Sequence, residues 1–239
     1  MSDLLPLEED WQRGLAIVAH PDDLEYGAAS AIARWTASGK NISYLLVTRG
    51  QSGIDGMPPE KAGPARAEEE RNSARVVGVE SVDFLDYPDG TVEYSLALRR
   101  DIARVIRRLQ PEVLISVTGE MAWGGHYLNQ ADHRHVALAT IDAARDAGNR
   151  WVFPEIVEGG LEPWNGAKRV LMSGSPNPTH AVDVSDYLDR GIASLKEHKL
   201  YLEGLGTNAD PAEFMTSFAE SAGKQLGVRY AVAFEVFYL

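Results

Sequence analysis

The chain reads LAIVAHPDDLE from Leu15 to Glu25. The first five of these residues form a short apolar run that ends at His20-Pro21. An uninterrupted apolar run of this length is typical of a strand buried on both faces, and such strands lie centrally in parallel sheets. We therefore expect a sheet built outward from this strand, with charged residues at its carboxyl end.

Strands and helices alternate after this first strand. The expected helices cover residues 25–38, 64–77, 95–109, 186–203 and 211–225, and the expected strands cover 42–47, 82–85, 113–117, 169–172, 181–184 and 231–237. This order predicts an α/β fold that is Rossmann-like, with three α/β/α layers and a mostly parallel sheet. We expect residues 1–239 to form a single domain, because a chain of this length can bury one core.

Two glycine-rich stretches, Gly50–Gly63 and Gly119–Asn129, match no regular element. Both follow the carboxyl ends of expected strands, where open parallel sheets bind their ligands. They are interpreted as the walls of a substrate pocket, or else as surface loops without a function.

Composition narrows the kinds of partner and site. The 239 residues contain no cysteine, so any metal must be held by nitrogen and oxygen ligands, and disulfides are excluded. The formal charge of −12 disfavours nucleic acid. No apolar run reaches the ~18–20 residues of a membrane span and the start does not resemble a signal peptide, so we expect a cytoplasmic protein without a membrane partner. The sequence leaves a homo-oligomer open.

An imidazole and two carboxylates lie together in the turn after the first strand. His20 ends the strand, Pro21 fixes the backbone direction, and Asp22 and Asp23 stand where a helix begins. Neighbouring carboxylates in such a turn must point different ways, so one can bind a metal while the other stays free. The alternative is that one aspartate caps the helix and His20 is a satisfied strand-end residue.

A second polar cluster reads NQADHRH from Asn129 to His135. Asn129 is expected to cap a helix that begins at Gln130, with Asp132 in the reciprocal capping position. His133 would then face inward with the small apolar residues of that helix. Taken alone, an inward histidine is more often a hydrogen-bonded core residue than a metal ligand.

Together these residues resemble the PIG-L or LmbE-like superfamily of zinc-dependent de-N-acetylases. The resemblance covers most of the chain and rests on AHPDDLE, TRGQSG from Thr48, RAEEERNSARVVGVESVDFLDYPDG from Arg66, QADH from Gln130 and AVAFEVF near the end. It implies that Zn²⁺ is bound by His20, Asp23 and His133, and that Asp22 is the general base.

The resemblance also implies roles for residues outside the metal site. Arg66 and Asp89 would line the pocket and contact sugar or cyclitol hydroxyls, although Arg66 could instead form a surface ion pair with Glu69 or Glu70. Asp132 would orient His133 or Gln130.

One position departs from the family pattern. The distal motif usually reads His-Pro-Asp-His, and here Gln130 replaces its first histidine. Glutamine can donate a hydrogen bond but cannot carry a proton or a charge. His126 or Tyr127 on the neighbouring loop substitutes, or zinc alone does this work, or the reaction is slow or altered.

The resulting hypothesis is hydrolysis of an N-acyl amide, most often N-acetyl, of a small-molecule amino sugar or related natural-product intermediate. A zinc-activated water would attack the amide, and Asp22 would take its proton. The alternative is a metal-containing accessory or binding protein with little turnover because of Gln130. A Rossmann-type nucleotide enzyme is disfavoured, because the first turn lacks G-x-G-x-x-G and carries acids that repel phosphate.

Overall fold

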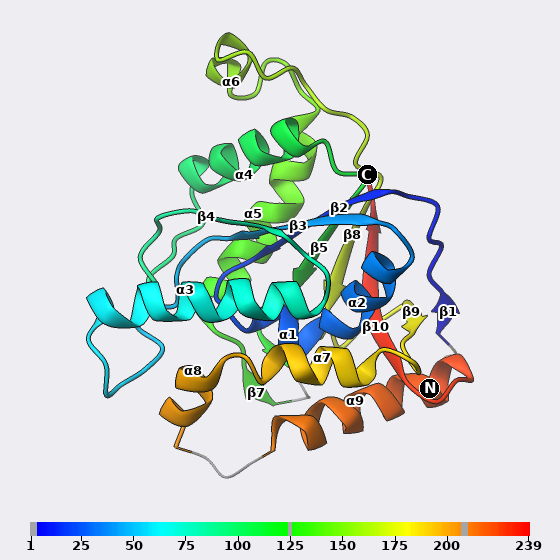
Figure 1. Ribbon diagram of the computed structural model, residues 1–239. Helices are drawn as coiled ribbons and strands as arrows, with labels where there is room; N and C mark the ends of the chain where they lie inside the picture. Colours follow the sequence, from blue (N-terminus) through cyan, green and yellow to red (C-terminus); the bar gives the residue numbers. More distant parts are fainter. Residues whose placement is uncertain (1–3, 124–125, 207–209) are drawn as a thin grey trace.

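The buried strand expected at residues 15–19 is β2 (Arg13–Val18), inside an eight-stranded sheet. The computed structural model describes residues 4–123, 126–206 and 210–239, and its sheet has the order β1-β9-β10-β8-β5-β2-β3-β4 (Figure 1). The other strands are β1 (Leu5–Pro6), β3 (Asn41–Leu46), β4 (Ser81–Phe84), β5 (Val113–Val117), β8 (Arg169–Ser173), β9 (His180–Asp183) and β10 (Ala231–Tyr238). Neighbouring strands are parallel except where β10 pairs with β8 and β9. The mostly parallel sheet is therefore confirmed.

Helices cover both faces of this sheet and complete the three predicted layers (Figure 1). One layer contains α4 (Leu96–Leu109) and α5 (Ala131–Ala147), and the other contains α1 (Asp23–Gly27), α2 (Ala29–Ala37), α3 (Pro59–Val76), α7 (Leu188–Leu195) and α9 (Pro211–Leu226). In β2, Leu15 and Ile17 pack in the core that α4 and α5 cover, whereas Ala16 and Val18 pack in the core on the opposite face, with α2. Because side chains alternate along a strand, only an uninterrupted apolar run can serve two cores.

Two expected helices are each divided in the structure. Residues 25–38 form α1 and α2 with a break at Ala28, whose φ of −131° is not helical. Residues 186–203 form α7 and α8 (Lys199–Gly204) with a break that includes His198. The second break places the His198 side chain in the interior, as described below.

The glycine-rich stretches contain more regular structure than expected. Helix α3 begins at Pro59 rather than near residue 64, because Pro58 is extended and Pro59 occupies the first helical position, which proline favours. The second stretch carries two short paired strands, β6 (Ala122–Trp123) and β7 (Tyr127–Leu128). A short helix that the sequence did not predict, α6 (Pro154–Glu158), lies beyond α5. Across the described ranges, no helix has both the length and the apolar character that a bilayer span requires.

Candidate active site

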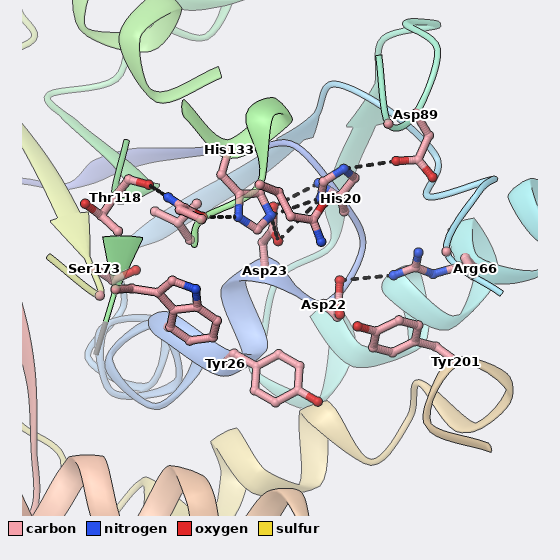
Figure 2. Close-up of a pocket in the computed structure, with 18 of the residues that line it drawn as sticks. His20, Asp22, Asp23, Tyr26, Arg66, Asp89, Thr118, His133, Ser173 and Tyr201 are labelled. Carbon is pink, nitrogen blue, oxygen red and sulfur yellow. Dashed lines mark hydrogen bonds and ion pairs between the residues drawn. The ribbon is translucent and has the colours of Figure 1, made fainter. Parts of the chain in front are cut away.

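A cavity of about 590 Å³ lies beyond the carboxyl end of β2 (Figure 2). His20 lies two residues after β2, in the turn that leads into α1. His133 lies in the first turn of α5. The lining includes residues from the segments after β3, β4 and β5, together with residues of α8 and α9; among them are His20, Asp22, Asp23, Tyr26, Ser52, Gly53, Arg66, Asp89, Thr118, Trp123, Asn129, Gln130, His133, Tyr201 and Phe214. Both glycine-rich stretches thus contribute to the wall, at the sheet edge where α/β proteins bind ligands.

Three donor atoms from two distant segments face one another in this cavity. His133 Nε2 lies 2.9 Å from Asp23 Oδ1 and 3.1 Å from His20 Nδ1, and the last two atoms are 3.7 Å apart. Ligands of a tetrahedral zinc ion with bonds of ~2.0–2.2 Å are separated by about 3.3–3.6 Å, and two of the three observed separations are shorter than this range and one is slightly longer. Two imidazoles and one carboxylate are a donor set that suits zinc. The three residues therefore fit the ion that the resemblance implies.

The Asp23 carboxylate is fixed by the backbone of its own turn. Its Oδ2 accepts hydrogen bonds from the N–H groups of Ala19 at 3.0 Å and His20 at 2.9 Å, which leaves Oδ1 facing the imidazoles. Although burial opposes it, the neighbouring His133 and His20 hold the pKa of Asp23 well below its usual range. Asp23 is therefore presented as a charged donor.

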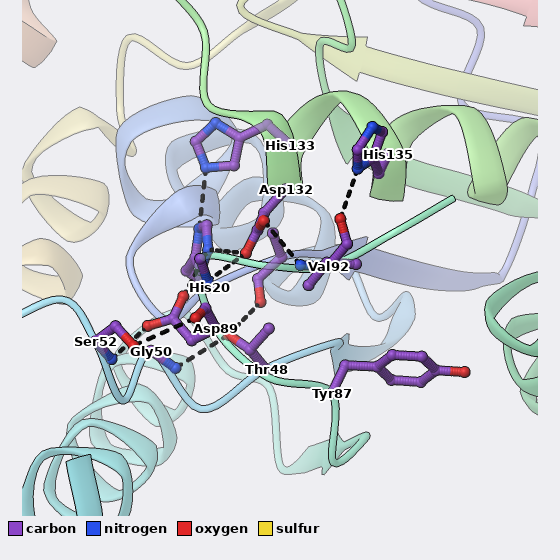
Figure 3. A network of polar contacts seen from close by, with 12 residues as sticks. His20, Thr48, Gly50, Ser52, Tyr87, Asp89, Val92, Asp132, His133 and His135 are labelled. Carbon is purple, nitrogen blue, oxygen red and sulfur yellow. Dashed lines mark hydrogen bonds and ion pairs between the residues drawn. The ribbon is translucent and has the colours of Figure 1, made fainter. Parts of the chain in front are cut away.

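The outer nitrogen of each imidazole faces an oxygen acceptor, and Figure 3 shows the contact of His20 with Asp132. His133 Nδ1 lies 2.8 Å from Asn129 Oδ1, and Asn129 donates through Nδ2 to the carbonyls of Thr118 and Glu120. His20 Nε2 lies 3.2 Å from Asp132 Oδ2, whose carboxylate also accepts the backbone N–H groups of Gly90 and Val92. With these outer nitrogens protonated, the lone pairs of His20 Nδ1 and His133 Nε2 point toward the same space.

These contacts correct two expectations. Asn129 does not cap α5: the residue before that helix is Gln130, which makes no side-chain capping bond, and the helix begins at Ala131. Asp132 contacts His20 rather than His133 or Gln130. Asn129 instead bonds the His133 ring and the carbonyls of the preceding loop, and Asp132 bonds segments distant in the chain, which neighbours along the sequence do not indicate.

Asp22 occupies a strained turn beside the donor atoms. Its φ of 98° is in the left-handed region, and its Oδ1 lies 3.0 Å from Arg66 Nη2 (Figure 2). Burial raises the pKa of the Asp22 carboxyl to about 6, with Arg66 opposing the rise and Asp23 adding to it. A side-chain hydrogen bond with Tyr201 also favours the charged form.

Arg66 and Asp89 both lie at the cavity. The buried Arg66 guanidinium donates to Gly50 O at 3.0 Å and Pro21 O at 2.5 Å besides Asp22, and it lies over the Tyr201 ring. The surface ion pair with Glu69 or Glu70 is therefore wrong. Asp89 places Oδ1 3.0 Å from His20 Nε2, and its Oδ2 accepts the N–H of Ser52.

The residues considered at and near the altered motif differ in whether they line the cavity; they are Gln130, His126 and Tyr127. Gln130 is exposed and lines the cavity. His126 and Tyr127 are exposed on the β6–β7 hairpin and are not among the residues that line it. The structure does not bring either side chain toward the donor atoms.

Sequence reasoning missed several residues of the site. Asn129 could have been found from its position four residues before His133, the spacing at which side chains meet at a helix start. No pattern could have found Tyr201, or the aromatic wall formed by Tyr26, Trp123 and Phe214. The ring centre of Phe214 lies 5.9 Å from that of Tyr26 and 6.4 Å from that of Trp123. These residues come from segments far apart in the chain.

The chain is similar to known proteins in sequence and in fold. Residues 15–144 match the family described as PIG-L, GlcNAc-PI de-N-acetylase. The diacetylchitobiose deacetylase of Thermococcus kodakarensis is 30% identical over 225 residues, which cover 93% of this chain and 82% of that protein.

Two solved structures share the fold. The N,N′-diacetylchitobiose deacetylase of Pyrococcus horikoshii superposes with a TM-score of 0.85 at 24% identity, covering 96% of this chain and 85% of its own. GalB, the 4-carboxy-2-hydroxymuconate hydratase of Pseudomonas putida, superposes with a TM-score of 0.75 at 20% identity, covering 95% and 97%. Because one fold carries a deacetylase and a hydratase, the reaction must be inferred from the site.

Proposed function

The chain belongs to the family described as PIG-L, GlcNAc-PI de-N-acetylase, and on that premise we propose that it is a zinc-dependent hydrolase that removes the N-acetyl group from a small amino-sugar substrate. The names of the similar proteins from Thermococcus kodakarensis and Pyrococcus horikoshii support this substrate class. The products are acetate and the free amine.

One observation carries the proposal. Asp22 and Asp23 are adjacent in the chain but present their carboxylates to different partners, Asp23 to the two imidazoles and Asp22 to Arg66. The turn thereby separates a metal-binding carboxylate from a carboxylate that stays free to exchange protons. Amide hydrolysis that uses both a metal and a general base needs this division of roles.

Asp22 is suited to act as the base. Its pKa of about 6 leaves the carboxylate charged at neutral pH and still basic enough to accept a proton. It takes a proton from water as the water oxygen bonds to the carbonyl carbon. It then returns a proton to the amide nitrogen as the C–N bond breaks. Arg66 holds Asp22 Oδ1, which keeps the carboxylate in one orientation during both transfers.

His20, Asp23 and His133 would hold the zinc ion. When bound there, zinc supplies a Lewis acid that lowers the pKa of water and polarises the amide carbonyl. Asn129 and Asp132 keep the imidazoles oriented toward it. Gln130 at the rim offers an amide N–H to the substrate and no proton.

The residues that line the cavity favour a substrate in which the amide is attached to a sugar ring. The lining includes the neighbouring aromatic rings of Tyr26, Trp123 and Phe214, together with the charged side chains of Arg66 and Asp89. Rings with apolar faces and polar edges bind to such mixed surfaces, since the apolar part packs on aromatics while hydroxyls find charged partners. A volume of about 590 Å³ is within the range of ligand pockets.

Amine release from N-acetylglucosamine and from N,N′-diacetylchitobiose tests the proposal. Asp22→Asn is the decisive variant, because asparagine tolerates a left-handed φ and keeps the side-chain volume. We expect a fall in kcat/KM of about 10²–10⁴-fold with zinc content unchanged. Asp189→Asn, at an exposed position on α7, is the matched control and should behave like the wild type. A zinc-loaded wild type that releases no amine from either sugar would contradict the proposal and favour an accessory protein.

A further inference from the structure

A second group of metal-ligating side chains lies inside the helical layer, away from the cavity. Glu25 of α1, Glu70 of α3 and His198 between α7 and α8 are each at most 1% exposed. One ligand atom from each residue lies within 4.8 Å of the others. Three chain segments, separated by 45 and 128 residues in the sequence, thus bring two carboxylates and an imidazole to one interior point.

These side chains lack partners for several polar atoms. Within the described part of the chain, both ring nitrogens of His198, Glu25 Oε2 and Glu70 Oε1 are buried without a hydrogen bond. The hydroxyl of Tyr44, a residue of β3, is also buried and unpartnered. An unpaired buried polar group costs about 1–3 kcal/mol, and native proteins keep few of them. So many in one place indicate a missing partner that all of them share.

The distances discriminate between two kinds of partner. His198 Nε2 lies 3.6 Å from Glu25 Oε1 and 3.7 Å from Glu70 Oε2. A protonated imidazole paired with a carboxylate would approach to about 2.7–2.9 Å. Two ligands on one divalent ion, with bonds of ~2.0–2.2 Å, are instead about 3.3–3.6 Å apart. The two separations from His198 Nε2 are too long for such an ion pair and lie at the upper end of the spacing between ligands of one ion, which favours an ion between the side chains.

Other contacts hold the two carboxylates in place. Ser73 Oγ donates to Glu25 Oε1 at 2.5 Å and lies 2.8 Å from Ser194 Oγ, while Glu70 Oε2 accepts the backbone N–H of Asp22 at 3.3 Å. Contacts other than His198 thus hold one oxygen of each carboxylate, while the other oxygen of each, Glu25 Oε2 and Glu70 Oε1, has no hydrogen-bond partner within the described residues. Burying two acids beside each other is unfavourable without a positive charge.

We propose that Glu25, Glu70 and His198 bind a second divalent cation, with zinc as the ion that suits one imidazole and two carboxylates. The ion neutralises the two carboxylates and ties α1 and α3 to the α7–α8 junction. Through Glu70 it also supports the backbone of Asp22. This inference does not depend on the proposed reaction, because it concerns an interior site that no substrate reaches.

Zinc stoichiometry tests the proposal. The full-length protein is stripped with a chelator and dialysed against zinc, and bound zinc per chain is measured by mass spectrometry of the metal. We expect two ions per chain in the wild type, and one in Glu70→Gln and in His198→Asn. Asp23→Asn should also retain one, because it affects only the first site.

Glu69→Gln is the matched control. Glu69 is also a buried glutamate of α3, but its Oε1 accepts the N–H of Leu200 and it is outside the cluster. This variant should keep two ions. A wild type with a single ion would overturn the proposal, as would a second ion that remains in both Glu70→Gln and His198→Asn.

Anomalous diffraction at the zinc edge tests the same point without variants, in case these buried substitutions prevent folding. Crystals of the zinc-loaded wild type should show two anomalous peaks, with the second between Glu25, Glu70 and His198. A water molecule at that point, without anomalous signal, would rule out the second site.

Discussion

Asn129 Oδ1 lies 2.8 Å from His133 Nδ1, and the amide group of Asn129 is fixed by two donated bonds, to Thr118 O and Glu120 O. The amide nitrogen is committed to those carbonyls, so the oxygen must face the imidazole. His133 is therefore protonated at Nδ1, with its Nε2 lone pair directed at Asp23 and His20.

Asn129→Ala should weaken zinc binding at the first site about 10–100-fold, because the His133 ring loses the acceptor that sets its tautomer and orientation. Competition with a chromophoric chelator measures this affinity. Asn177→Ala, at an exposed loop position, is the control. Equal zinc affinity in Asn129→Ala and the wild type would mean that Asn129 does not orient the ligand.

Asp132→Asn should destabilise the fold as well as the site. The carboxylate accepts from three N–H groups, those of Gly90, Val92 and His20, and an asparagine side chain offers one acceptor oxygen in place of two. One buried N–H would face an NH₂ group, at a cost of about 1–3 kcal/mol in the free energy of unfolding. Urea denaturation measures this loss, and zinc affinity should fall in the same variant. An unchanged unfolding midpoint would contradict the bonding pattern.

Gly53→Ala should disturb Arg66 without disturbing the fold. A Cβ at Gly53 would lie 2.1 Å from Arg66 Nη1, and Arg66 is held by Gly50, Pro21 and Asp22 and cannot retreat without breaking those bonds. We expect kcat/KM to fall at least about tenfold, since a small misplacement of a positioning group is costly in catalysis.

Gly56→Ala is the matched control for this change. It lies in the same loop, and a Cβ there would have no heavy atom within 4 Å. Activity of this variant should equal that of the wild type. If both glycine variants lose activity alike, flexibility of the loop rather than the position of Arg66 would be responsible.

Glu112 binds the backbone at the start of β2 and should make the free energy of unfolding depend on pH. Its Oε2 accepts the N–H groups of Gln12 and Arg13, and these two hydrogen bonds hold the pKa of Glu112 below its ordinary value of 4.5. Because the folded pKa is lowered, the stabilisation is fully present above pH 4.5 and is lost as the pH falls through the folded pKa.

Glu112→Gln keeps an acceptor but removes the charge. The wild type should exceed this variant by about 0.5–1 kcal/mol in free energy of unfolding at pH 7, a modest value because solvent screens the group. The difference should shrink progressively below pH 4.5, as measured by urea denaturation at several pH values. Glu80→Gln, at an exposed position, should show no such trend.

The sequence by itself determined the layers of the fold and the turn in which His20, Asp22 and Asp23 lie. The run from Leu15 to Ala19 required burial on both faces, and only a central parallel strand provides that. The adjacent Asp22 and Asp23 in a turn after that strand had to diverge. Local chain geometry and hydrophobic burial are encoded over a few residues, so both could be predicted.

Only the tertiary structure decided which side chains complete the site. Asn129 reaches His133, Asp132 reaches His20 across more than a hundred residues, and Tyr201 arrives from α8 to contact Asp22. The same holds for His198, which a break between two helices turns into the interior. A hydrogen bond forms within a few tenths of an ångström, and the packing of distant segments, not the residue pattern along the chain, sets distances on that scale.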